Sequence, residues 1–279
     1  MTIQQLLKKY YQSNSLPPQE IDQLLAVSLH RSLEYIYKNP KKELSLSAVK
    51  TFDKLWRLRQ ENYSLARLRG YQEFYGLKFL VNKHTLIPRP ASETLIKEAL
   101  KFLAKQKNSK VIDIGTGSGC LIITLAKNFS AAEYFAVDIS ASALAVAKTN
   151  ARKHLSRQKF STDKLKIKFI KSNLWSKIPK LKFNLIVANL HYLTKEQLKE
   201  PSIKREPLTA LYGGQNGLKY YEKLLAKIKK FLADQYEILL EIDPPQVADI
   251  KNLIKKYLPQ ANIEILKDLN KDNRVVKIN

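Results

Sequence analysis

The sequence predicts an α/β protein in which a doubly wound, Rossmann-like sheet of seven strands follows a small helical domain. Two observations support this fold class. From residue 110 onward, short apolar runs alternate with helical patterns, and this alternation is typical of parallel β-α-β units. The chain has 279 residues, which fits one large domain and one smaller one. We therefore expect a helical domain over residues 1–70, a linker over residues 71–90 and the sheet domain over residues 91–279.

The first 70 residues show helical patterns only. Their apolar positions recur mostly every three or four residues, so each helix is expected to bury one face in a small bundle. One helix is expected at the start of the chain, a second from Pro18 through Ile36, and a third after an N-cap at Ser45 or Ser47. The aromatic residues of this region are expected to belong to its core.

A β-hairpin is expected to link the two domains. Residues 73–81 form a strand-like run of aromatic and aliphatic side chains. Asn82-Lys83-His84 is expected to form the turn, and Thr85-Leu86-Ile87 the returning strand. Prolines then stiffen the exit of the hairpin, and Ser92 is expected to cap a helix over residues 93–105.

Seven strand candidates follow in the larger domain. They are Val111–Ile114, Tyr134–Val137, Lys166–Ile170, Phe183–Ala188, Glu237–Ile242, Ile263–Leu266 and Arg274–Ile278. Helices or long crossovers separate the first five, so these strands should be parallel and connected in right-handed units. The last two lie close together in the sequence, so they are expected to form a hairpin in which one strand runs antiparallel to the rest.

A glycine-rich turn after the first strand predicts a nucleotide-type pocket. Asp113 lies in that strand, and Gly115, Thr116, Gly117 and Gly119 follow it, up to the start of a helix. Glycine lets the backbone turn sharply and approach a ligand closely. The N–H groups at a helix N-terminus add partial positive charge at the same place. The pocket should therefore lie at the carboxyl edge of the sheet.

Two acidic residues indicate which nucleotide the pocket holds. Asp138 closes the next strand, nineteen residues after Gly119, and an acid there accepts the hydroxyl groups of a ribose. Asp113 stands two residues before the first glycine of the turn. Its carboxylate would repel a diphosphate, but it suits a cationic amino-acid end or a ribose. The pattern favours S-adenosylmethionine, and a nicotinamide dinucleotide is the alternative.

Asn189 is the candidate for the reacting end of the pocket. It ends the fourth strand, so its side chain should lie beside the glycine-rich turn. An asparagine amide can accept a hydrogen bond from a substrate –NH₂ group and donate one to a substrate carbonyl. These are the groups of a glutamine amide, and adenine offers a similar amine edge. The ring of Tyr192 can pack against such a planar group, near the positive sulphonium.

The motifs resemble the HemK-type protein glutamine-N5 methyltransferases that modify peptide-chain release factors. The resemblance covers nearly the whole chain, and it is carried by Glu73–Phe79, Leu86–Pro90, Asp113–Gly119, Asp138, Asn189–Tyr192, Glu206–Gly214 and Leu240–Ile242. It implies the methyltransferase version of the doubly wound sheet. It also implies transfer of a methyl group from S-adenosylmethionine to a glutamine in the Gly-Gly-Gln loop of a release factor, with the N-terminal bundle recognising this substrate.

The resemblance also implies roles for individual residues. Asn189 and Tyr192 are the catalytic pair, and the substrate-binding residues are Asn189, Leu190, His191, Tyr192 and Arg89. The cofactor-binding residues are Asp113, Gly115, Thr116, Gly117, Gly119, Asp138, Asn173 and Asn189. Two departures stand out. The family's Asn-Pro-Pro-Tyr is Asn189-Leu190-His191-Tyr192 here, and the acid that receives the adenine amine is Asn173. His191 either takes a proton after transfer or is a loop residue in the place of a structural proline.

Composition bears on partners and location. The chain has 49 Lys and Arg against 25 Asp and Glu, a net charge of +24, which favours a polyanionic partner such as ribosomal RNA. The basic residues are nevertheless scattered through the chain. Cys120 is the single cysteine, which excludes an internal disulfide and fits a reducing compartment. No apolar run is long enough to span a bilayer, and no leader pattern is recognised. We expect a cytoplasmic monomer with no membrane partner and no metal.

Two other functions stay open from the residues alone. An Asn-x-x-Tyr motif also serves adenine, and the chain is very basic, so a nucleic-acid amine methyltransferase is one alternative. A protein that retains the cofactor fold with weakened or no catalysis is the other, because Leu190-His191 replaces two prolines of the family motif.

Overall fold

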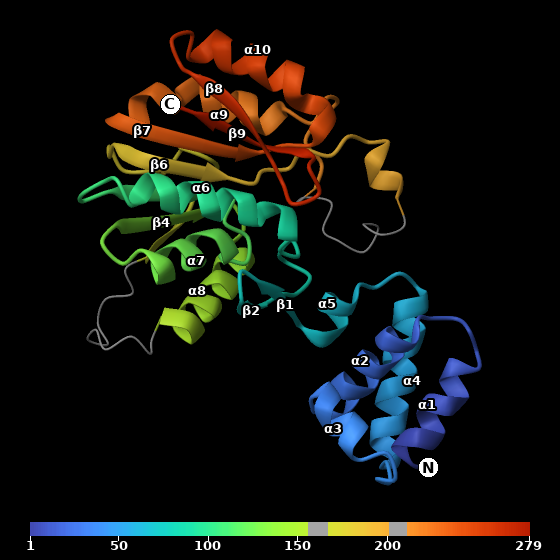
Figure 1. Cartoon of the computed structure of the whole chain (residues 1–279). Helices are drawn as coiled ribbons and strands as arrows, with labels where there is room; N and C mark the ends of the chain where they lie inside the picture. Colours follow the sequence, from blue (N-terminus) through green and yellow to red (C-terminus); the bar gives the residue numbers. More distant parts are fainter. Residues whose placement is uncertain (156–166, 201–210) are drawn as a thin grey trace. The chain divides into compact units, whose positions relative to one another are not determined.

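The computed structural model describes residues 1–155, 167–200 and 211–279 (Figure 1). Its contacts divide the chain into two compact units. The smaller is built on Met1–Tyr71, and the larger on Gln72–Lys199 and the C-terminal segment that ends at Asn279. Within the described residues, no helix is both long enough and apolar enough to cross a membrane.

The smaller unit is helical, as the sequence predicts. Its helices are α1 (Ile3–Tyr11), α2 (Pro18–Leu29), α3 (Leu33–Lys38), α4 (Leu46–Gln60) and α5 (Leu65–Arg69). Ser45 caps α4 by accepting a hydrogen bond from the Ala48 N–H. Phe52 is fully buried, and the ring of Tyr10 packs edge-on against it with centroids 4.8 Å apart. These two aromatic residues are therefore part of the core, as expected.

The single long second helix expected through Ile36 is wrong. Helix α2 ends at Leu29 because His30 adopts the left-handed conformation, with φ of 52°. A new helix, α3, starts after Ser32, whose side chain accepts a hydrogen bond from the Tyr35 N–H. The apolar spacing continues across His30, so it gave no sign of this break. A left-handed conformation is also rare for a residue other than glycine.

The hairpin is present, but its turn lies earlier than expected. Its strands are β1 (Tyr71–Phe74) and β2 (Leu77–Leu80). Tyr75 and Gly76, with φ of 48° and 71°, form the two-residue turn between them. Positive φ at both central positions gives the twist that joins two short antiparallel strands. The expected turn at residues 82–84 and the expected strand at residues 85–87 are therefore wrong.

The larger unit contains the predicted seven-stranded sheet. Its strands are β3 (Lys110–Ile114), β4 (Glu133–Asp138), β5 (Ile167–Lys171), β6 (Phe183–Ala188), β7 (Leu232–Glu241), β8 (Ile263–Lys267) and β9 (Asn273–Ile278). Their order is β5-β4-β3-β6-β7-β9-β8. The first five in this order are parallel, and β9 is antiparallel to both β7 and β8. This confirms the fold class and the terminal hairpin.

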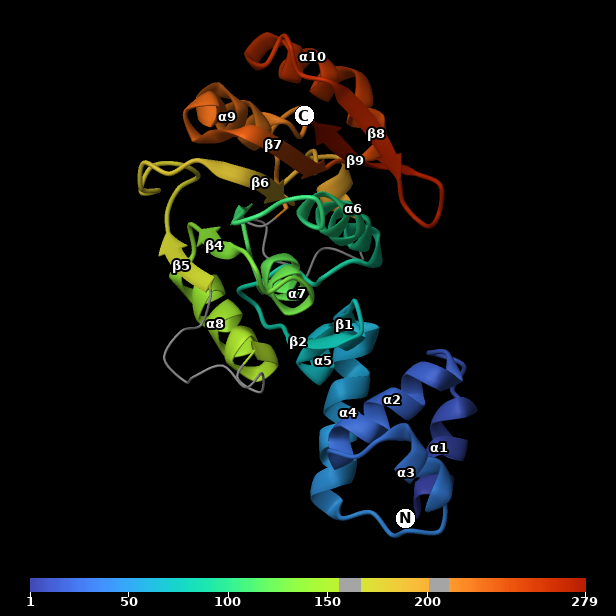
Figure 2. The same cartoon turned by 60° about the vertical axis from the view of Figure 1, so that its left-hand side comes forward.

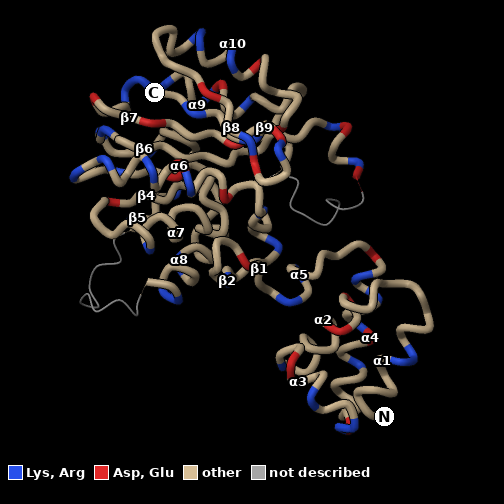
Figure 3. Tube along the Cα trace, in the orientation of Figure 1, with Lys and Arg blue, Asp and Glu red and all other residues tan. Residues whose placement is uncertain are grey.

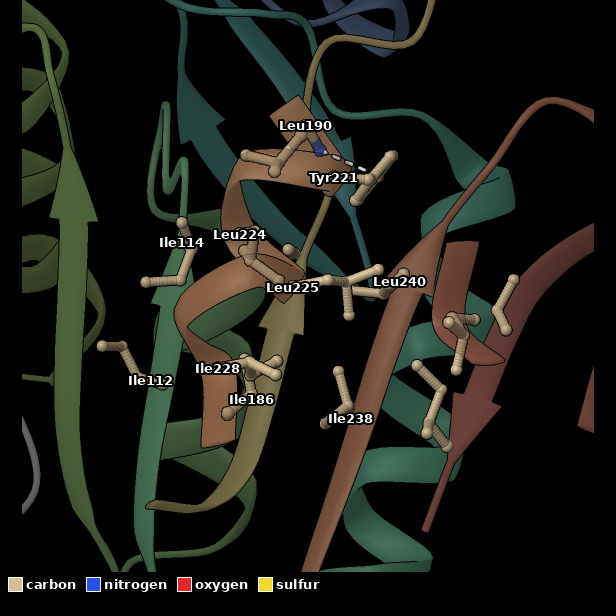
Figure 4. Close-up of a cluster of buried hydrophobic side chains, with 14 of the residues drawn as sticks. Ile112, Ile114, Ile186, Leu190, Tyr221, Leu224, Leu225, Ile228, Ile238 and Leu240 are labelled. Carbon is tan, nitrogen blue, oxygen red and sulfur yellow. Dashed lines mark hydrogen bonds between the residues drawn. The ribbon is translucent and has the colours of Figure 1, made fainter. Parts of the chain in front are cut away.

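Helices cover both faces of this sheet (Figure 2). They are α6 (Glu93–Leu103), α7 (Cys120–Asn128), α8 (Ala141–Leu155), α9 (Lys219–Ile228) and α10 (Val247–Tyr257), with 3₁₀ turns at Pro90–Ser92, Gln197–Lys199, Lys229–Phe231 and Pro244–Gln246. One face packs against α6, α7 and α8. The other packs against α9 and α10, where Leu224 and Ile228 of α9 belong to the same buried cluster as Ile186 and Ile238 of the strands (Figure 4). The alternating strand residues supply the two cores.

A buried carboxyl group in β7 makes the stability of the sheet depend on pH. Glu237 is 4% exposed, and burial raises its pKa from 4.5 to about 7, although the Lys277 ammonium group 3.7 Å away opposes this shift. Between these two pH values the unfolded chain loses the proton that the folded protein retains. The contribution of Glu237 to stability is therefore complete below pH 4.5 and falls as the pH rises to 7.

We expect Glu237→Gln to stabilise the protein at pH 8 by on the order of 2 kcal/mol. Glutamine has the shape of the protonated acid, so it avoids the cost of the buried charge. At pH 4.5 the substitution should change the free energy of unfolding little. Urea unfolding at both pH values measures the difference, and a stabilisation of equal size at both would contradict this account.

Candidate functional site

A cavity of about 420 Å³ lies in the larger unit, at the carboxyl ends of β3, β4 and β6. Ligands bind at this edge of a doubly wound sheet, and the volume is within the range of small-molecule sites. Its walls come from six short segments, 83–89, 114–118, 120–121, 137–140, 172–174 and 189–191, and from the single residues Ser92, Ala143 and Tyr220.

The turn between β3 and α7 needs glycine at each predicted position. Gly115, Gly117 and Gly119 have φ of 81°, 54° and 80°, in the region that side chains disfavour. A Cβ on Gly115 would lie 2.9 Å from Cδ2 of Leu190, and one on Gly119 would lie 2.7 Å from Cδ1 of Ile123. The turn can therefore pass close to the 189–192 segment and to α7 only because these side chains are missing.

Asp138 lies in the cavity wall at the end of β4. Its Oδ2 accepts a hydrogen bond from the Gly117 N–H at 2.9 Å, and its Oδ1 accepts one from the Ser140 N–H at 2.8 Å. Burial raises the pKa of this carboxyl group, and the backbone donors partly oppose the shift. Each carboxylate oxygen has a second lone pair, so the fixed carboxylate can still accept hydrogen bonds from a ligand.

Asp113 is placed differently from the expectation that it contacts the ligand. It is not among the described residues that line the cavity, and it is 1% exposed. The Thr116 hydroxyl donates to its Oδ2 at 2.6 Å, and burial raises its pKa to about 7. The hydrogen bond between Thr116 and Asp113 thus fixes the glycine turn to the end of β3.

Asn189 lines the cavity immediately after β6. Its Nδ2 donates a hydrogen bond to Oγ of Ser92 at 3.1 Å. Its Oδ1 is buried and has no hydrogen-bond partner in the described part of the chain. A buried acceptor without a donor costs about 1–3 kcal/mol. A donor group from a bound ligand would remove this cost.

Ser92 is not the helix cap that the sequence suggested. Its own backbone is helical, with φ of −68° and ψ of −11°, and its side chain makes no capping hydrogen bond. An N-cap residue needs an extended backbone, and the 3₁₀ turn at Pro90–Ser92 precludes this. The hydroxyl group instead accepts the bond from Asn189.

The residues after Asn189 are fixed by packing and hydrogen bonds. Leu190 is buried, and its N–H donates to the hydroxyl of Tyr221 at 3.2 Å (Figure 4). The ring of His191 packs edge-on against Tyr220, with centroids 5.0 Å apart. Burial lowers the pKa of His191 to about 4, so the imidazole is neutral at pH 7. Of the two roles considered for His191, this favours the loop residue over the proton acceptor.

Tyr192 lies behind the cavity rather than in its wall, judged by the described residues that line it. Its hydroxyl donates to Oε1 of Glu241 at 3.3 Å, and burial raises its pKa. The sequence led us to expect the Tyr192 ring against the substrate, but the ring does not lie in the cavity wall here. Arg89 and Asn173 do line the cavity.

The glycine segment 213–217 packs against the backbone of the 189–192 segment. A Cβ on Gly213 would lie 2.4 Å from the carbonyl oxygen of His191. A Cβ on Gly217 would lie 2.1 Å from that of Tyr192. These contacts show a turn that supports the 189–192 segment. The preceding motif residues 206–210 lie outside the described residues.

Three residues contact the site although the sequence analysis gave them no role in it. Ser92 and Tyr221 hydrogen bond to Asn189 and Leu190, and Glu241 accepts the Tyr192 hydroxyl. The Leu-Glu-Ile step around Glu241 was part of the resemblance, and an acid at the end of a central strand was the available signal. The sequence around Ser92 is typical of a helix N-cap, and nothing in the sequence around Tyr221 indicated a role in the site.

Comparisons with known proteins agree along most of the chain. Residues 105–274 match the model of a methyltransferase domain family. A release factor glutamine methyltransferase of Dictyoglomus turgidum is 32% identical over 262 residues, which cover 93% of this chain and 90% of that protein. A bifunctional methyltransferase of Rickettsia bellii is 32% identical over 293 residues, which cover 94% of this chain and 51% of that protein. The chain thus spans about half the length of such bifunctional relatives.

A solved structure shows the same fold. A methyltransferase from Pyrococcus furiosus superposes with a TM-score of 0.51 at 16% sequence identity, over 81% of this chain and 96% of that chain. At this identity, the likeness concerns the fold alone.

Proposed function

The chain belongs to the release factor glutamine methyltransferase family, and we propose that it transfers a methyl group from S-adenosylmethionine to the side-chain amide nitrogen of a glutamine in a release factor. One observation carries the proposal. Asn189, with an amide oxygen that has no partner among the described residues, lines the same cavity as the glycine turn and Asp138. A methyl donor and a planar amide can therefore meet in one enclosed place.

The residues of the cavity fit S-adenosylmethionine. The glycines at 115 and 117 leave the wall of the turn without side chains, and the N-terminus of α7 at Cys120 favours a ligand carboxylate. The fixed carboxylate of Asp138 can accept the ribose hydroxyl groups, and Asn173 can accept the adenine amine. When bound, the cofactor supplies an electrophilic methyl group on its sulphonium.

The protein's part in the reaction is positioning. An amide lone pair is delocalised, so the nitrogen is a weak nucleophile and must be held at attack distance. Positioning of this kind can supply roughly 7–11 kcal/mol. Asn189 would accept the substrate N–H through Oδ1, which also stabilises the positive charge that develops on the nitrogen. No base is needed before attack. Leu190, His191 and Arg89 also line the cavity, and they would form the walls around the substrate.

A labelling experiment tests the function. The protein is incubated with methyl-labelled S-adenosylmethionine and either a purified release factor or total RNA. We expect label on the glutamine of the Gly-Gly-Gln loop, and none on a release factor in which this glutamine is alanine. Transfer to RNA but not to protein would replace the proposal by a nucleic-acid methyltransferase. Cofactor binding without any transfer would indicate a non-catalytic protein.

The RNA arm is included because the chain is strongly basic. The net charge is +24, and Lys and Arg are spread over helices and strands of both units rather than gathered in one stripe (Figure 3). Such a surface attracts phosphate backbones without selecting a sequence. We propose that any contact with ribosomal RNA is of this electrostatic kind.

The neutral state of His191 gives a further prediction. Its pKa of about 4 makes it a poor proton acceptor at pH 7, so the proton lost from the methylated amide should leave by another route. We expect His191→Gln to leave the shape of the pH profile of kcat between pH 6 and 8 unchanged. Loss of an ionisation with a pKa between 6 and 8 in the variant would show that His191 titrates during the reaction.

A further inference from the structure

Glu241 lies at the centre of the hydrogen bonds that hold the 189–192 segment. It ends β7 and is 1% exposed. Strand β7 runs beside β6, where Leu240 pairs with Ala188, so the carboxyl group lies next to Asn189. The Tyr192 hydroxyl donates to Oε1 at 3.3 Å, and Oε2 is buried with no hydrogen-bond partner among the described residues. The Ser92 hydroxyl and the Asn189 amide lie close enough to the carboxyl group to favour its charged form.

The backbone of Glu241 contributes as well. Its carbonyl oxygen accepts a hydrogen bond from the Tyr221 hydroxyl, and the same hydroxyl accepts the Leu190 N–H at 3.2 Å. One residue thus holds the segment in two ways. Its backbone fixes Leu190 through Tyr221, and its side chain faces the polar groups of Asn189 and Tyr192.

We propose that Glu241, together with Ser92, is a positioning residue that fixes the rotation of the Asn189 amide, so that Nδ2 faces the protein and Oδ1 is left for the substrate. The inference rests on the proposed function for its catalytic consequence. The orientation itself is a property of the folded protein and can be measured without any substrate.

The physical reason lies in what each group can donate and accept. An asparagine amide can rotate by 180° and exchange its donor and acceptor sides. An ionised carboxylate offers acceptors only, so the rotated amide would place Oδ1 against another acceptor. Ser92 accepts from the same Nδ2 at 3.1 Å. Burial raises the pKa of Glu241, and the Ser92 hydroxyl and the Arg274 guanidinium oppose this shift by favouring the charged form.

Glutamine at position 241 is therefore the diagnostic change. It has the size and shape of glutamate, but its amide donates as well as accepts, so it tolerates both rotations of Asn189. The matched control is Glu237→Gln, which makes the same change four residues earlier in the same strand. Glu237 is also buried, but it pairs with Lys277 and does not line the cavity, as judged from the described residues.

The first readout is hydrogen exchange of the Asn189 side-chain amide, in protein labelled with ¹⁵N at asparagine and assigned by comparison with Asn189→Ala. We expect exchange at least tenfold faster in Glu241→Gln than in the wild type, and unchanged exchange in Glu237→Gln. Ser92→Ala should act in the same direction and Ser92→Thr should not, which covers the case that Glu241→Gln does not fold. Wild-type exchange in both Glu241→Gln and Ser92→Ala would overturn the proposal.

The second readout is kinetic. We expect Glu241→Gln and Ser92→Ala to lower kcat by 10–100-fold with KM for S-adenosylmethionine within twofold, Ser92→Thr to restore kcat, and Glu237→Gln to change neither. Faster exchange with an unchanged kcat would overturn the proposal as well. A wild-type protein that transfers no methyl group would reject the proposed function, and the exchange rates would then still decide whether Glu241 and Ser92 orient the amide.

Discussion

Asn189→Ala is expected to reduce kcat for methyl transfer by about 10²–10³-fold, the size of the loss when one preorganised polar group is removed from a developing charge. The variant keeps the glycine turn and Asp138, which form the cofactor side of the cavity. Its affinity for S-adenosylmethionine should therefore stay within a few-fold of the wild type. Single-turnover transfer to a release factor measures the rate, and calorimetry measures cofactor binding.

The matched control for this variant is Asn252→Ala. Asn252 is an exposed asparagine on α10 and does not line the cavity formed by the described residues. Its replacement should leave both the rate and the cofactor affinity unchanged. If Asn189→Ala lost cofactor affinity in parallel with the rate, Asn189 would be needed to bind the cofactor and would have no separate role in the transfer step. Wild-type transfer by this variant would remove Asn189 from the reaction.

The features that the sequence predicted correctly depend on local periodicity and on strand ends. The seven strands were visible because apolar runs alternate with helical patterns, and the parallel order follows from the connections. Asp138 and Asn189 were found for a related reason. Each lies at the end of a strand, and the carboxyl ends of parallel strands meet at one edge of the sheet, so residues 51 positions apart come to line one cavity.

The features that sequence reasoning missed depend on tertiary contacts or on unusual backbone conformations. The hydrogen bond between Ser92 and Asn189 joins residues 97 positions apart, and nothing near Ser92 distinguishes it from a helix cap. Tyr221 occupies an ordinary buried position of α9, and only its hydroxyl connects it to Leu190. The break at His30 depends on a left-handed non-glycine residue. For the hairpin, Gly76 within the strand-like run was an available sign of a turn.

The glycine segment 213–217 leads to the second large expected effect. Gly217→Ala should lower the free energy of unfolding by about 2–5 kcal/mol, because two costs combine. The left-handed backbone at φ of 74° costs about 1–2 kcal/mol for a residue with a Cβ. The Cβ would also lie 2.1 Å from the Tyr192 carbonyl oxygen and 2.1 Å from Nε2 of Gln246, and overpacking of this kind costs about 1–3 kcal/mol more.

Gly76→Ala separates these two costs. Gly76 has nearly the same backbone, with φ of 71°, but a Cβ there would meet no atom within 4 Å. It lies in the same unit of the chain as Gly217, so urea unfolding reports both variants on one scale. We expect Gly76→Ala to cost only the conformational part, about 1–2 kcal/mol, and to leave kcat unchanged. Equal destabilisation by the two substitutions would show that Gly217 is needed for its backbone angle alone.

The activity of Gly217→Ala connects this effect to the site. Gln246 donates from Nε2 to the Tyr192 carbonyl at 3.0 Å and to the Asn216 carbonyl at 3.1 Å, and the added methyl group would occupy the space of this bond. The segment that carries Asn189 would then lose the hydrogen bond that holds its backbone at Tyr192, three residues after Asn189. We therefore expect kcat to fall in Gly217→Ala at temperatures where the variant is still folded, and to stay at the wild-type value in Gly76→Ala. Wild-type kcat in folded Gly217→Ala would show that the glycine segment stabilises the fold without positioning the site.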